Sequence, residues 1–563
     1  MVTVAQQNSE AELTPVWEIA DAGGGTWTHD PMHFPRPITP LFESLFCDTH
    51  ANGFTTAAHE NAIPLKRFNS KTANHYYFNR VEFLIPRDEA EAQTFGARAE
   101  AAGRRESARM MERWETEHLP RIRVLLTQIR TMDAESASRP DAMVLIDEIR
   151  AILTELWVIH FRIAQPMMAT ILAFVDFHTD LFGGSEADAH DLLLGRRSKS
   201  VEAGIGLSDL ARDAREAGLA SVILETPVDD LHGALAVSAE GRDFLGKLTA
   251  YLDQYGLRQD LFELDQPTWQ EDPRIALASV QTYLRSGHDA AAEHEQTARN
   301  ADAALASALE RLATYPQPVR DQFAGMAQAA RAAAFLQEEH NFYIDQQGFA
   351  LLRYALLGFG RRLVAQPVID EPDDIFMLTI DEVKAIVAGP VGADRDVDVR
   401  AIVAQRHDEM ARSARLTPPP FIGDPPAAGS GAPSLGERAM LKFFGGPPQQ
   451  ADAPNQLKGN AGSRGVARGV ARVSLTLDEA KTLQTGEILV TTTTMPAWTP
   501  LFGTARAVVT ETGGSLSHCA IVAREYGIPA VVGAFGATRA IKTGDLITVD
   551  GDRGVVTLGA DAE

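Results

Sequence analysis

The sequence predicts a multidomain protein in which a large helical domain is followed by a compact α/β domain. Its 563 residues are enough for about two to four domains. From about Arg87 to about Val387, apolar residues recur every three or four positions, the period of an amphipathic helix. From Lys458 to about Gly559, short β-branched runs alternate with Gly and Asp turn residues, which is typical of an α/β module.

The first half of the chain divides into two segments by composition. We expect residues 1–86 to be irregular and to pack on the helical domain, because four prolines fall between Pro31 and Pro40. A strand-like run from Tyr76 to Ile85 closes this segment. Residues 87–412 form the predicted helical domain.

The second half begins with residues 413–457, which are rich in Pro and Gly and are predicted to form a tether between domains. A short helix from Gly436 to Phe444 is expected to interrupt it. Residues 458–560 form the predicted α/β domain. Its expected strands are Val466–Ser474, Glu487–Thr492, Ala507–Thr510, Ala530–Val532 and Leu546–Val549, and its expected helices are Leu477–Leu483 and His518–Tyr526.

Composition excludes several classes of function. The chain has 52 Lys+Arg and 76 Asp+Glu, a net charge of −24. Such an acidic excess argues against a nucleic-acid ligand and against docking on anionic lipid, because both require a basic surface. Two cysteines, Cys47 and Cys519, rule out a disulfide scaffold and a cysteine-rich metal site.

The sequence also carries information on localisation. Met1–Pro15 has neither a basic start nor an apolar core, so we expect no secretory signal. The most apolar stretch, Met167–Phe182, is interrupted by two aspartates and a histidine, and we expect a buried helix rather than a membrane span. A cytoplasmic protein is therefore expected.

The most informative segment surrounds His518. A predicted strand ends at Thr510, Gly513 and Gly514 permit a tight turn, and Ser517 is a suitable N-cap for a helix that begins at His518. Free backbone N–H groups and the helix dipole at such a position favour a phosphoryl group. The alternative is a capping histidine with no chemistry.

The wider context resembles a known family. The segment Gly513–Gly533 resembles the phosphohistidine swivelling domain of the phosphoenolpyruvate-utilising enzymes, which include rifampicin phosphotransferase, and Gly462–Gly469 and Thr543–Gly551 resemble its two ends. The resemblance implies that His518 is transiently phosphorylated and that its domain travels between two sites. It also implies that the neighbouring residues bind or support the phosphoryl group; these are Gly513, Gly514, Ser515, Ser517 and Arg524.

Two other parts of such enzymes are not evident. The sequence shows no Gly-rich nucleotide loop and no region resembling an ATP-grasp domain or a phosphoenolpyruvate site. The resemblance therefore implies a separate ATP-grasp subunit that binds ATP and Mg²⁺. We expect no tightly bound cofactor and no metal site in this chain.

The central region resembles the acceptor-binding domain of rifampicin phosphotransferase. The similarity is diffuse but ordered, through Pro37–Leu41, Tyr255–Gly256, Pro267–Trp269, Glu338–Tyr343 and Asp373–Thr379. The layout also resembles the histidine-carrying subunit of two-component phenylphosphate synthase and the pair that phosphorylates p-cresol. These resemblances imply a small-molecule acceptor with a phenolic or other aromatic hydroxyl.

Weaker patterns suggest where that acceptor would bind. Trp157, His160, Phe161 and His178 lie on one apolar helical stretch, which indicates either an aromatic acceptor pocket or ordinary core packing. His160 or His178 is a candidate base for the acceptor hydroxyl. The basic segment Gly195–Ser200, with Lys199, is either a phosphate-receiving loop or a solvated one.

Two further clusters have equally simple alternatives. Glu338, Glu339 and His340 suggest either a Mg²⁺ site or base, or a charged helix face. His29 and His33 near Asp30 give only a weak metal signal.

Taken together, the sequence predicts a phosphotransferase subunit in which His518 passes a phosphoryl group to a small-molecule hydroxyl. The alternative is a non-enzymatic phosphocarrier or regulatory interaction module. A deep cavity in the helical domain favours the enzyme, whereas a solid helical core favours the module.

Overall fold

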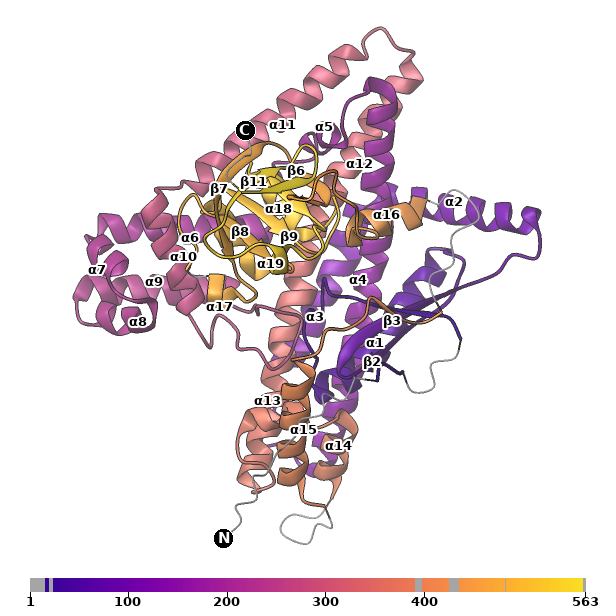
Figure 1. The fold of residues 1–563 in the computed structure, drawn as a ribbon. Helices are drawn as coiled ribbons and strands as arrows, with labels where there is room; N and C mark the ends of the chain where they lie inside the picture. The colour runs from indigo at the N-terminus through magenta and orange to yellow at the C-terminus, as the bar shows by residue number, and fades with distance from the viewer. Residues whose placement is uncertain (1–15, 20–23, 390–396, 425–434, 481, 560–563) are drawn as a thin grey trace, which may run out of the picture.

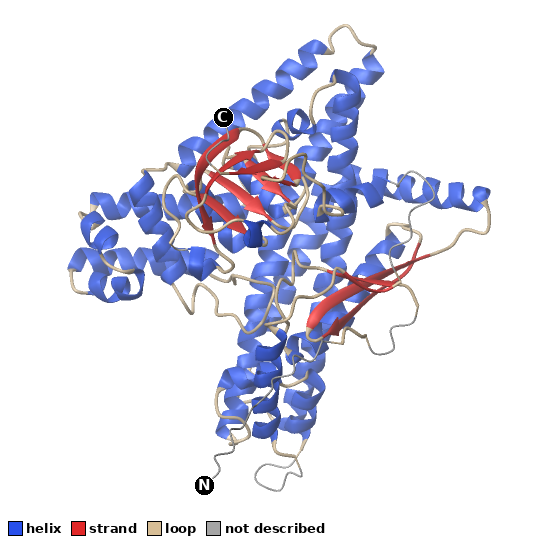
Figure 2. Ribbon diagram, viewed as in Figure 1, coloured by secondary structure: helices blue, strands red, loops and turns tan. Residues whose placement is uncertain are grey.

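The computed structural model describes residues 16–19, 24–389, 397–424, 435–480 and 482–559. Figure 1 shows an elongated helical body with the C-terminal α/β domain lying against its middle, and Figure 2 shows that the strands form two separate sheets. The predicted fold class, a helical domain followed by a compact α/β domain, is confirmed.

The helical body is built around α4 (Arg139–Phe182), a helix of 44 residues. Ser138 caps its N-terminus by accepting a hydrogen bond from Asp141 N–H, and Gly183, with φ of 68°, ends it. By length and composition α4 is the one described helix that could cross a membrane, but 61% of its most apolar window is buried inside the protein. It is therefore the core helix that the sequence predicted around Met167–Phe182.

The other helices of the body precede or follow α4 in the chain, and α1, α2, α12 and α14 are among those that contact it directly. Those before it are α1 (Pro40–Glu60), α2 (Glu89–Arg113), the π-helix η1 (Trp114–His118) and α3 (Leu119–Arg130). Those after it are α5 (Glu186–Asp191), α6 (Lys199–Glu216), α7 (Ala220–Glu225), α8 (Val228–Ala236), α9 (Ala239–Tyr255), α10 (Arg274–Ser286), α11 (Ala290–Arg311), α12 (Gln317–Asn341), the π-helix η2 (Phe342–Gly348), α13 (Phe349–Ala365), the 3₁₀ helix η3 (Pro372–Met377), α14 (Ile380–Ala388) and α15 (Val399–Ser413).

The N-terminal segment is more regular than predicted. It contains the 21-residue helix α1 and the strands β1 (Thr26–His29), β2 (Leu65–Ala73) and β3 (Tyr76–Phe83). Thr39 caps α1 and Pro40 stands in its first turn, where a missing N–H costs nothing. The prolines that suggested irregular chain therefore lead into a helix.

The predicted tether is also partly ordered. Its strand β4 (Phe421–Gly423) pairs antiparallel with β1 and completes a four-stranded sheet in the order β2-β3-β1-β4. Its helix α16 (Leu435–Phe444) packs on α4, where Arg438 pairs with Asp176 at 2.6 Å. Residues 425–434 of the tether lie outside the described residues.

The C-terminal domain contains an eight-stranded sheet in the order β5-β12-β11-β7-β8-β9-β10-β6, in which β7 to β10 are parallel. The strands are β5 (Gln456–Lys458), β6 (Asn460–Ser463), β7 (Val466–Val473), β8 (Ile488–Thr491), β9 (Ala507–Thr510), β10 (Ala530–Val532), β11 (Leu546–Asp550) and β12 (Val555–Leu558). The helices are α17 (Leu477–Ala480), the 3₁₀ helix η4 (Pro496–Gly503), α18 (His518–Glu525) and α19 (Ala537–Ala540).

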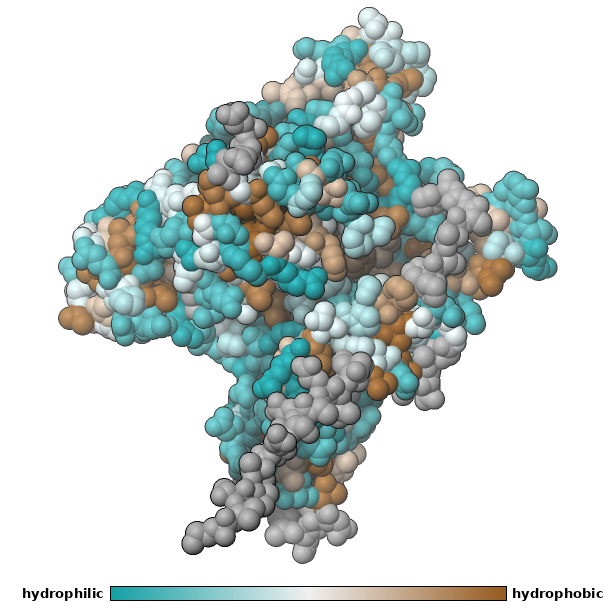
Figure 3. All heavy atoms as spheres, in the orientation of Figure 1, coloured by the Kyte–Doolittle hydropathy of each residue, from teal (hydrophilic) through white to brown (hydrophobic). Residues whose placement is uncertain are grey.

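The five strands and two helices expected here are present, although several are shorter than predicted. Sequence reasoning missed β5, β6 and β12. The outer side of this domain exposes Val466, Val470 and Phe535, and Figure 3 shows hydrophobic residues gathered over this part of a mostly polar surface.

The contact between α1 and α4 gives the first prediction. Gly53 of α1 lies so close to α4 that a Cβ there would stand 2.8 Å from the Trp157 carbonyl carbon. We expect Gly53→Ala to destabilise the protein by about 1–3 kcal/mol, because backbone cannot yield as a flexible side chain can. Urea unfolding measures the change.

Gly103 on α2 is the matched control, because a Cβ there meets nothing within 4 Å. Gly103→Ala should be neutral or stabilising, by up to about 1 kcal/mol. Equal effects of the two substitutions would contradict the close approach of α1 and α4.

Candidate active site

His518 is the first residue of α18 and follows a tight turn after β9. Ser517 precedes it in an extended conformation, as an N-cap residue does. Gly513 has a φ of +95°, which favours glycine. A Cβ on Gly514 would stand 2.7 Å from the Lys442 carbonyl carbon, so the turn needs its second glycine for the close approach of α16.

The turn is fixed by hydrogen bonds from two directions. Gly514 N–H donates to Phe443 O and Leu516 N–H donates to Lys442 O, each at 2.9 Å, so the end of α16 holds its outer side. Arg524 holds its inner side by donating to Ser515 O at 2.8 Å and to Gly462 O at 2.6 Å. Burial lowers the pKa of Arg524 to about 10, still far above neutrality. The protonated guanidinium of Arg524 therefore holds the turn through these two hydrogen bonds.

The imidazole of His518 contacts a carboxylate of the helical domain. Its Nδ1 lies 3.2 Å from Glu338 Oε1, and Ser200 Oγ donates to the other oxygen of Glu338 at 2.9 Å. Burial opposes ionisation of Glu338, but the charge of His518 and the hydrogen bonds from His518 and Ser200 outweigh it and hold the pKa of Glu338 below its ordinary value. Glu338 is therefore an ionised carboxylate that faces His518 across the seam, the interface between the helical and C-terminal domains.

The second nitrogen of His518 is left free. Nε2 is buried and has no hydrogen-bond partner among the described residues. A histidine whose Nδ1 is held by a carboxylate presents Nε2 as the reactive atom, because the bond at one ring nitrogen fixes the role of the other.

Further contacts hold the C-terminal domain on the helical domain. Asp260 accepts hydrogen bonds from Trp498 Nε1 at 2.7 Å and from Leu477 N–H at 3.1 Å. Arg464 pairs with Asp188 and Asp191. The structure therefore shows a docked state in which His518 is covered.

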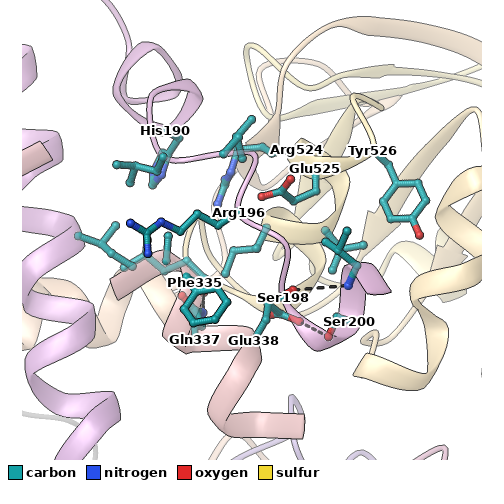
Figure 4. A pocket seen from close by; sticks show the side chains of 18 of the residues that line it. His190, Arg196, Ser198, Ser200, Phe335, Gln337, Glu338, Arg524, Glu525 and Tyr526 are labelled. Carbon is teal, nitrogen blue, oxygen red and sulfur yellow. Dashed lines mark hydrogen bonds between the residues drawn. The ribbon is translucent and has the colours of Figure 1, made fainter. Parts of the chain in front are cut away.

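A cavity lies along the same seam (Figure 4). Residues of both domains line it, among them Arg196, Ser200, Gln337 and Glu338 from the helical domain and Leu516, Arg524 and Glu525 from the C-terminal domain. His518 itself does not line it. Glu338 does, so one carboxylate separates the cavity from His518.

Part of the basic segment Gly195–Ser200 lies at this cavity. Arg196, Ser198 and Ser200 line it. Lys199 does not line the cavity. Its ammonium pairs with Glu202 at 2.6 Å, and its backbone N–H donates a hydrogen bond to the Glu339 carboxylate.

Three of the four predicted aromatic acceptor residues are brought together, and the fourth is not. The ring centroid of His160 lies 5.0 Å from that of Trp157 and 4.8 Å from that of Phe161, and Trp157 and Phe161 also pack against His50 of α1. None of these three residues lines the seam cavity. His178 lies on α4 18 residues after His160, which is about 27 Å at the rise of an α-helix. It packs there against Phe182 and Phe323. The four residues therefore do not form one pocket.

The remaining clusters can also be placed. Among the described residues no group of three or more His, Cys, Asp or Glu side chains is arranged to hold a metal ion. His33 Nδ1 instead pairs with Asp30 at 2.8 Å. The sequence singled out Glu338 but did not predict its contact with His518. It gave no sign of the contact between Asp260 and Trp498, because these residues are 238 positions apart in the chain.

Comparisons with known proteins agree with this architecture. Residues 483–554 match the family described as PEP-utilising enzyme, mobile domain, and residues 160–338 match the rifampicin phosphotransferase fourth domain. The predicted resemblance to the phosphoenolpyruvate-utilising enzymes, and in layout to rifampicin phosphotransferase, is thereby confirmed.

Individual relatives extend the likeness over most of the chain. It is 34% identical to chondramide synthase cmdD of Chondromyces crocatus over 97% of its length, and 27% identical to the uncharacterized phosphotransferase YvkC of Bacillus subtilis over 99%. It is 33% identical to rifampicin phosphotransferase of Streptomyces sviceus over 59%. The chain spans 14%, 65% and 36% of these three relatives.

The seam gives a prediction on pH. Burial raises the pKa of Glu525, which lines the cavity, from 4.5 to about 7. A carboxyl with a raised pKa costs stability as pH rises from 4.5 towards 7, because the unfolded state loses its proton first. Glu525→Gln should therefore gain stability over wild type across this interval, and the gain should level off above pH 7. Urea unfolding at several pH values measures it.

Glu310→Gln serves as the control, because Glu310 is exposed on α11. Its difference from wild type should not vary over the same interval. A Glu525→Gln difference that is equally flat would show that Glu525 is ionised normally at the seam.

Proposed function

We propose that this chain is a phosphotransferase component in which His518 carries a phosphoryl group to the hydroxyl of a small molecule, a phenol or another aromatic alcohol. The observation that carries the proposal is the contact across the seam: Nδ1 is held by Glu338 and Nε2 is free. Relatives named as phosphotransferases support it.

The first step loads His518. Nε2 attacks a phosphoryl group of ATP, so that a P–N bond forms as a P–O bond breaks and the nucleotide leaves with the electron pair. A partner with an ATP-grasp fold would hold ATP and Mg²⁺, because no nucleotide loop is evident in this sequence. For this step the seam contacts must open.

The second step unloads His518 in the docked state. The acceptor oxygen forms a P–O bond, the P–Nε2 bond breaks, and its electron pair returns to the imidazole while the hydroxyl proton passes to a base or to solvent. Glu338 assists because its carboxylate keeps a proton on Nδ1, so that the departing group is a neutral imidazole. The burial of Nε2 excludes water, which otherwise competes with the acceptor.

An observation also separates this proposal from a non-enzymatic phosphocarrier. A carrier needs only an accessible histidine, whereas a transferase needs room for an acceptor beside it. The cavity beside Glu338 favours the enzyme, although the Glu338 carboxylate separates it from His518 and it does not lie within the aromatic stretch of α4.

Phosphoramidate, a small phosphoryl donor, tests the first half of the proposal without a partner. We predict that it adds one acid-labile phosphoryl group to the wild-type chain, detected by intact mass, and none to His518→Ala. The exposed His232→Gln variant should be modified like wild type. Equal modification of His518→Ala would show that another residue is phosphorylated.

The same loaded protein tests the second half. Phenol added to it should yield phenyl phosphate, detected by chromatography, as the mass of the protein returns to its starting value. Release of inorganic phosphate alone would contradict transfer to a phenolic hydroxyl.

The role of Glu338 gives a separate prediction. Glu338→Gln keeps the size of the side chain but removes the charge that orients Nδ1–H in the docked state, so transfer from loaded His518 to phenol should slow at least about tenfold, about 1.4 kcal/mol in the barrier. The pH profile of this transfer should also shift. Glu339→Gln is the control, because Glu339 contacts Lys199 and not His518. An unchanged rate and profile would make Glu338 a merely structural residue.

A further inference from the structure

Tyr526 caps the C-terminal end of the helix that begins at His518, and its ring contacts the helical domain across the seam (Figure 4). It stacks on His288, with 6.0 Å between the ring centroids and 12° between the ring planes. His288 stacks in turn on Tyr283 of α10, at 5.3 Å and 14°. Three rings from the two domains therefore form one continuous stack.

Two glycines, one from each domain, make room for this stack. A Cβ on Gly204 of α6 would stand 2.7 Å from the Tyr526 hydroxyl oxygen, and a Cβ on Gly503 of η4 would stand 3.1 Å from a ring carbon of Tyr283. Neither glycine has a positive φ, so space and not backbone conformation requires the missing side chain. The helical domain therefore holds a seat for Tyr526, formed by Gly204, Tyr283 and His288.

Contacts within the helical domain hold this seat in place. Tyr283 is buried, and His288 Nδ1 lies 2.8 Å from Glu293 Oε1, which fixes the direction of the imidazole ring. Burial raises the pKa of Tyr526 to about 12, so its hydroxyl is neutral at physiological pH. The seat therefore receives a neutral ring in one orientation.

The helix α18 is thus fixed at both ends. His518 contacts Glu338 at its start, and Tyr526 occupies the seat at its end. The eight residues of α18 span about 12 Å, so a tilt of about 10° would move one end by about 2 Å relative to the other. Such a shift would break the 3.2 Å contact between His518 Nδ1 and Glu338. The second contact therefore sets the direction of the helix that carries His518.

We propose that Tyr526 is a positioning residue, whose seat holds the C-terminal domain in the docked state and so aligns His518 with Glu338. Tyr526 forms and breaks no bond in the reaction and acts through His518. Its effect on docking is independent of the proposed function, whereas its effect on phosphoryl transfer rests on that function.

A pair of substitutions tests the seat in the full chain. Gly204→Ala places a Cβ too close to the Tyr526 hydroxyl, although alanine favours the helix that carries it. Tyr526→Phe removes that hydroxyl, and the next ring atom, Cζ, lies at an ordinary contact distance of 3.9 Å. The double variant should therefore dock like wild type. The matched control is Gly246→Ala on α9, where a Cβ meets nothing within 4 Å.

Docking is measured by the reaction of His518 with diethyl pyrocarbonate, followed by peptide mass, with the exposed His232 as an internal reference. Nε2 of His518 is buried in wild type and should react slowly. Gly204→Ala should raise this rate at least about tenfold, because overpacking a fitted contact shifts an equilibrium by this order. Gly246→Ala and Tyr526→Phe alone should leave it unchanged, and the double variant should return to the wild-type rate.

The two half reactions give a second readout, which a merely structural defect would not reproduce. Gly204→Ala should be loaded by phosphoramidate faster than wild type, because His518 is accessible once the domain leaves its seat. The loaded variant should transfer its phosphoryl group to phenol more slowly. Adding Tyr526→Phe should reverse both changes, whereas a defect in folding would slow both reactions.

Each outcome decides one part of the proposal. An unchanged rate of His518 modification in Gly204→Ala, or a raised rate that Tyr526→Phe does not reverse, overturns the seat. Faster modification with unchanged transfer to phenol keeps the seat and overturns its role in alignment. If wild type is not loaded at all, the proposed function fails while the modification rates still decide the seat. If Gly204→Ala fails to fold by circular dichroism, Tyr526→Ala empties the seat instead and should raise the modification rate in the same way.

Discussion

One contact across a domain seam, between Glu338 and the imidazole of His518, organises this molecule. It joins the end of α12 to the start of α18, and it is accompanied by the bond from Ser200 at the start of α6. Three helix ends from two domains thus meet at one carboxylate. Removing one partner of such a buried charged contact is costly, so all three ends are constrained together.

Other polar contacts accompany this one between the two domains. Asp260 accepts two hydrogen bonds from the C-terminal domain, and Arg464 pairs with two aspartates of α5. Exposed ion pairs are individually weak and sensitive to salt, and a few hydrogen bonds can be exchanged for water. A seam built this way suits the undocking that the proposed function requires, whereas a wholly apolar seam would oppose it.

Local signals in the sequence predicted the local structure well. The strand ending at Thr510, the glycine pair and the helix start at His518 are each encoded within a few residues, and the helical domain follows from its periodicity. Proline misled at Pro40, where the same residue that ends helices also begins one. The partner of His518 was beyond reach, because the contact with Glu338 joins residues 180 apart and depends on docking.

Strand β4 changes how the linker between the domains should be regarded. Its pairing with β1 fastens the chain at Gly423, well past the end of α15. In the proposed function, the C-terminal domain would therefore pivot about the edge of a sheet. The distance that it could travel would depend on the chain from that edge to β5, and on whether α16 stays on α4 or leaves with the turn that it holds. A substitution that breaks the pairing of this three-residue strand with β1 would then lengthen the reach of His518.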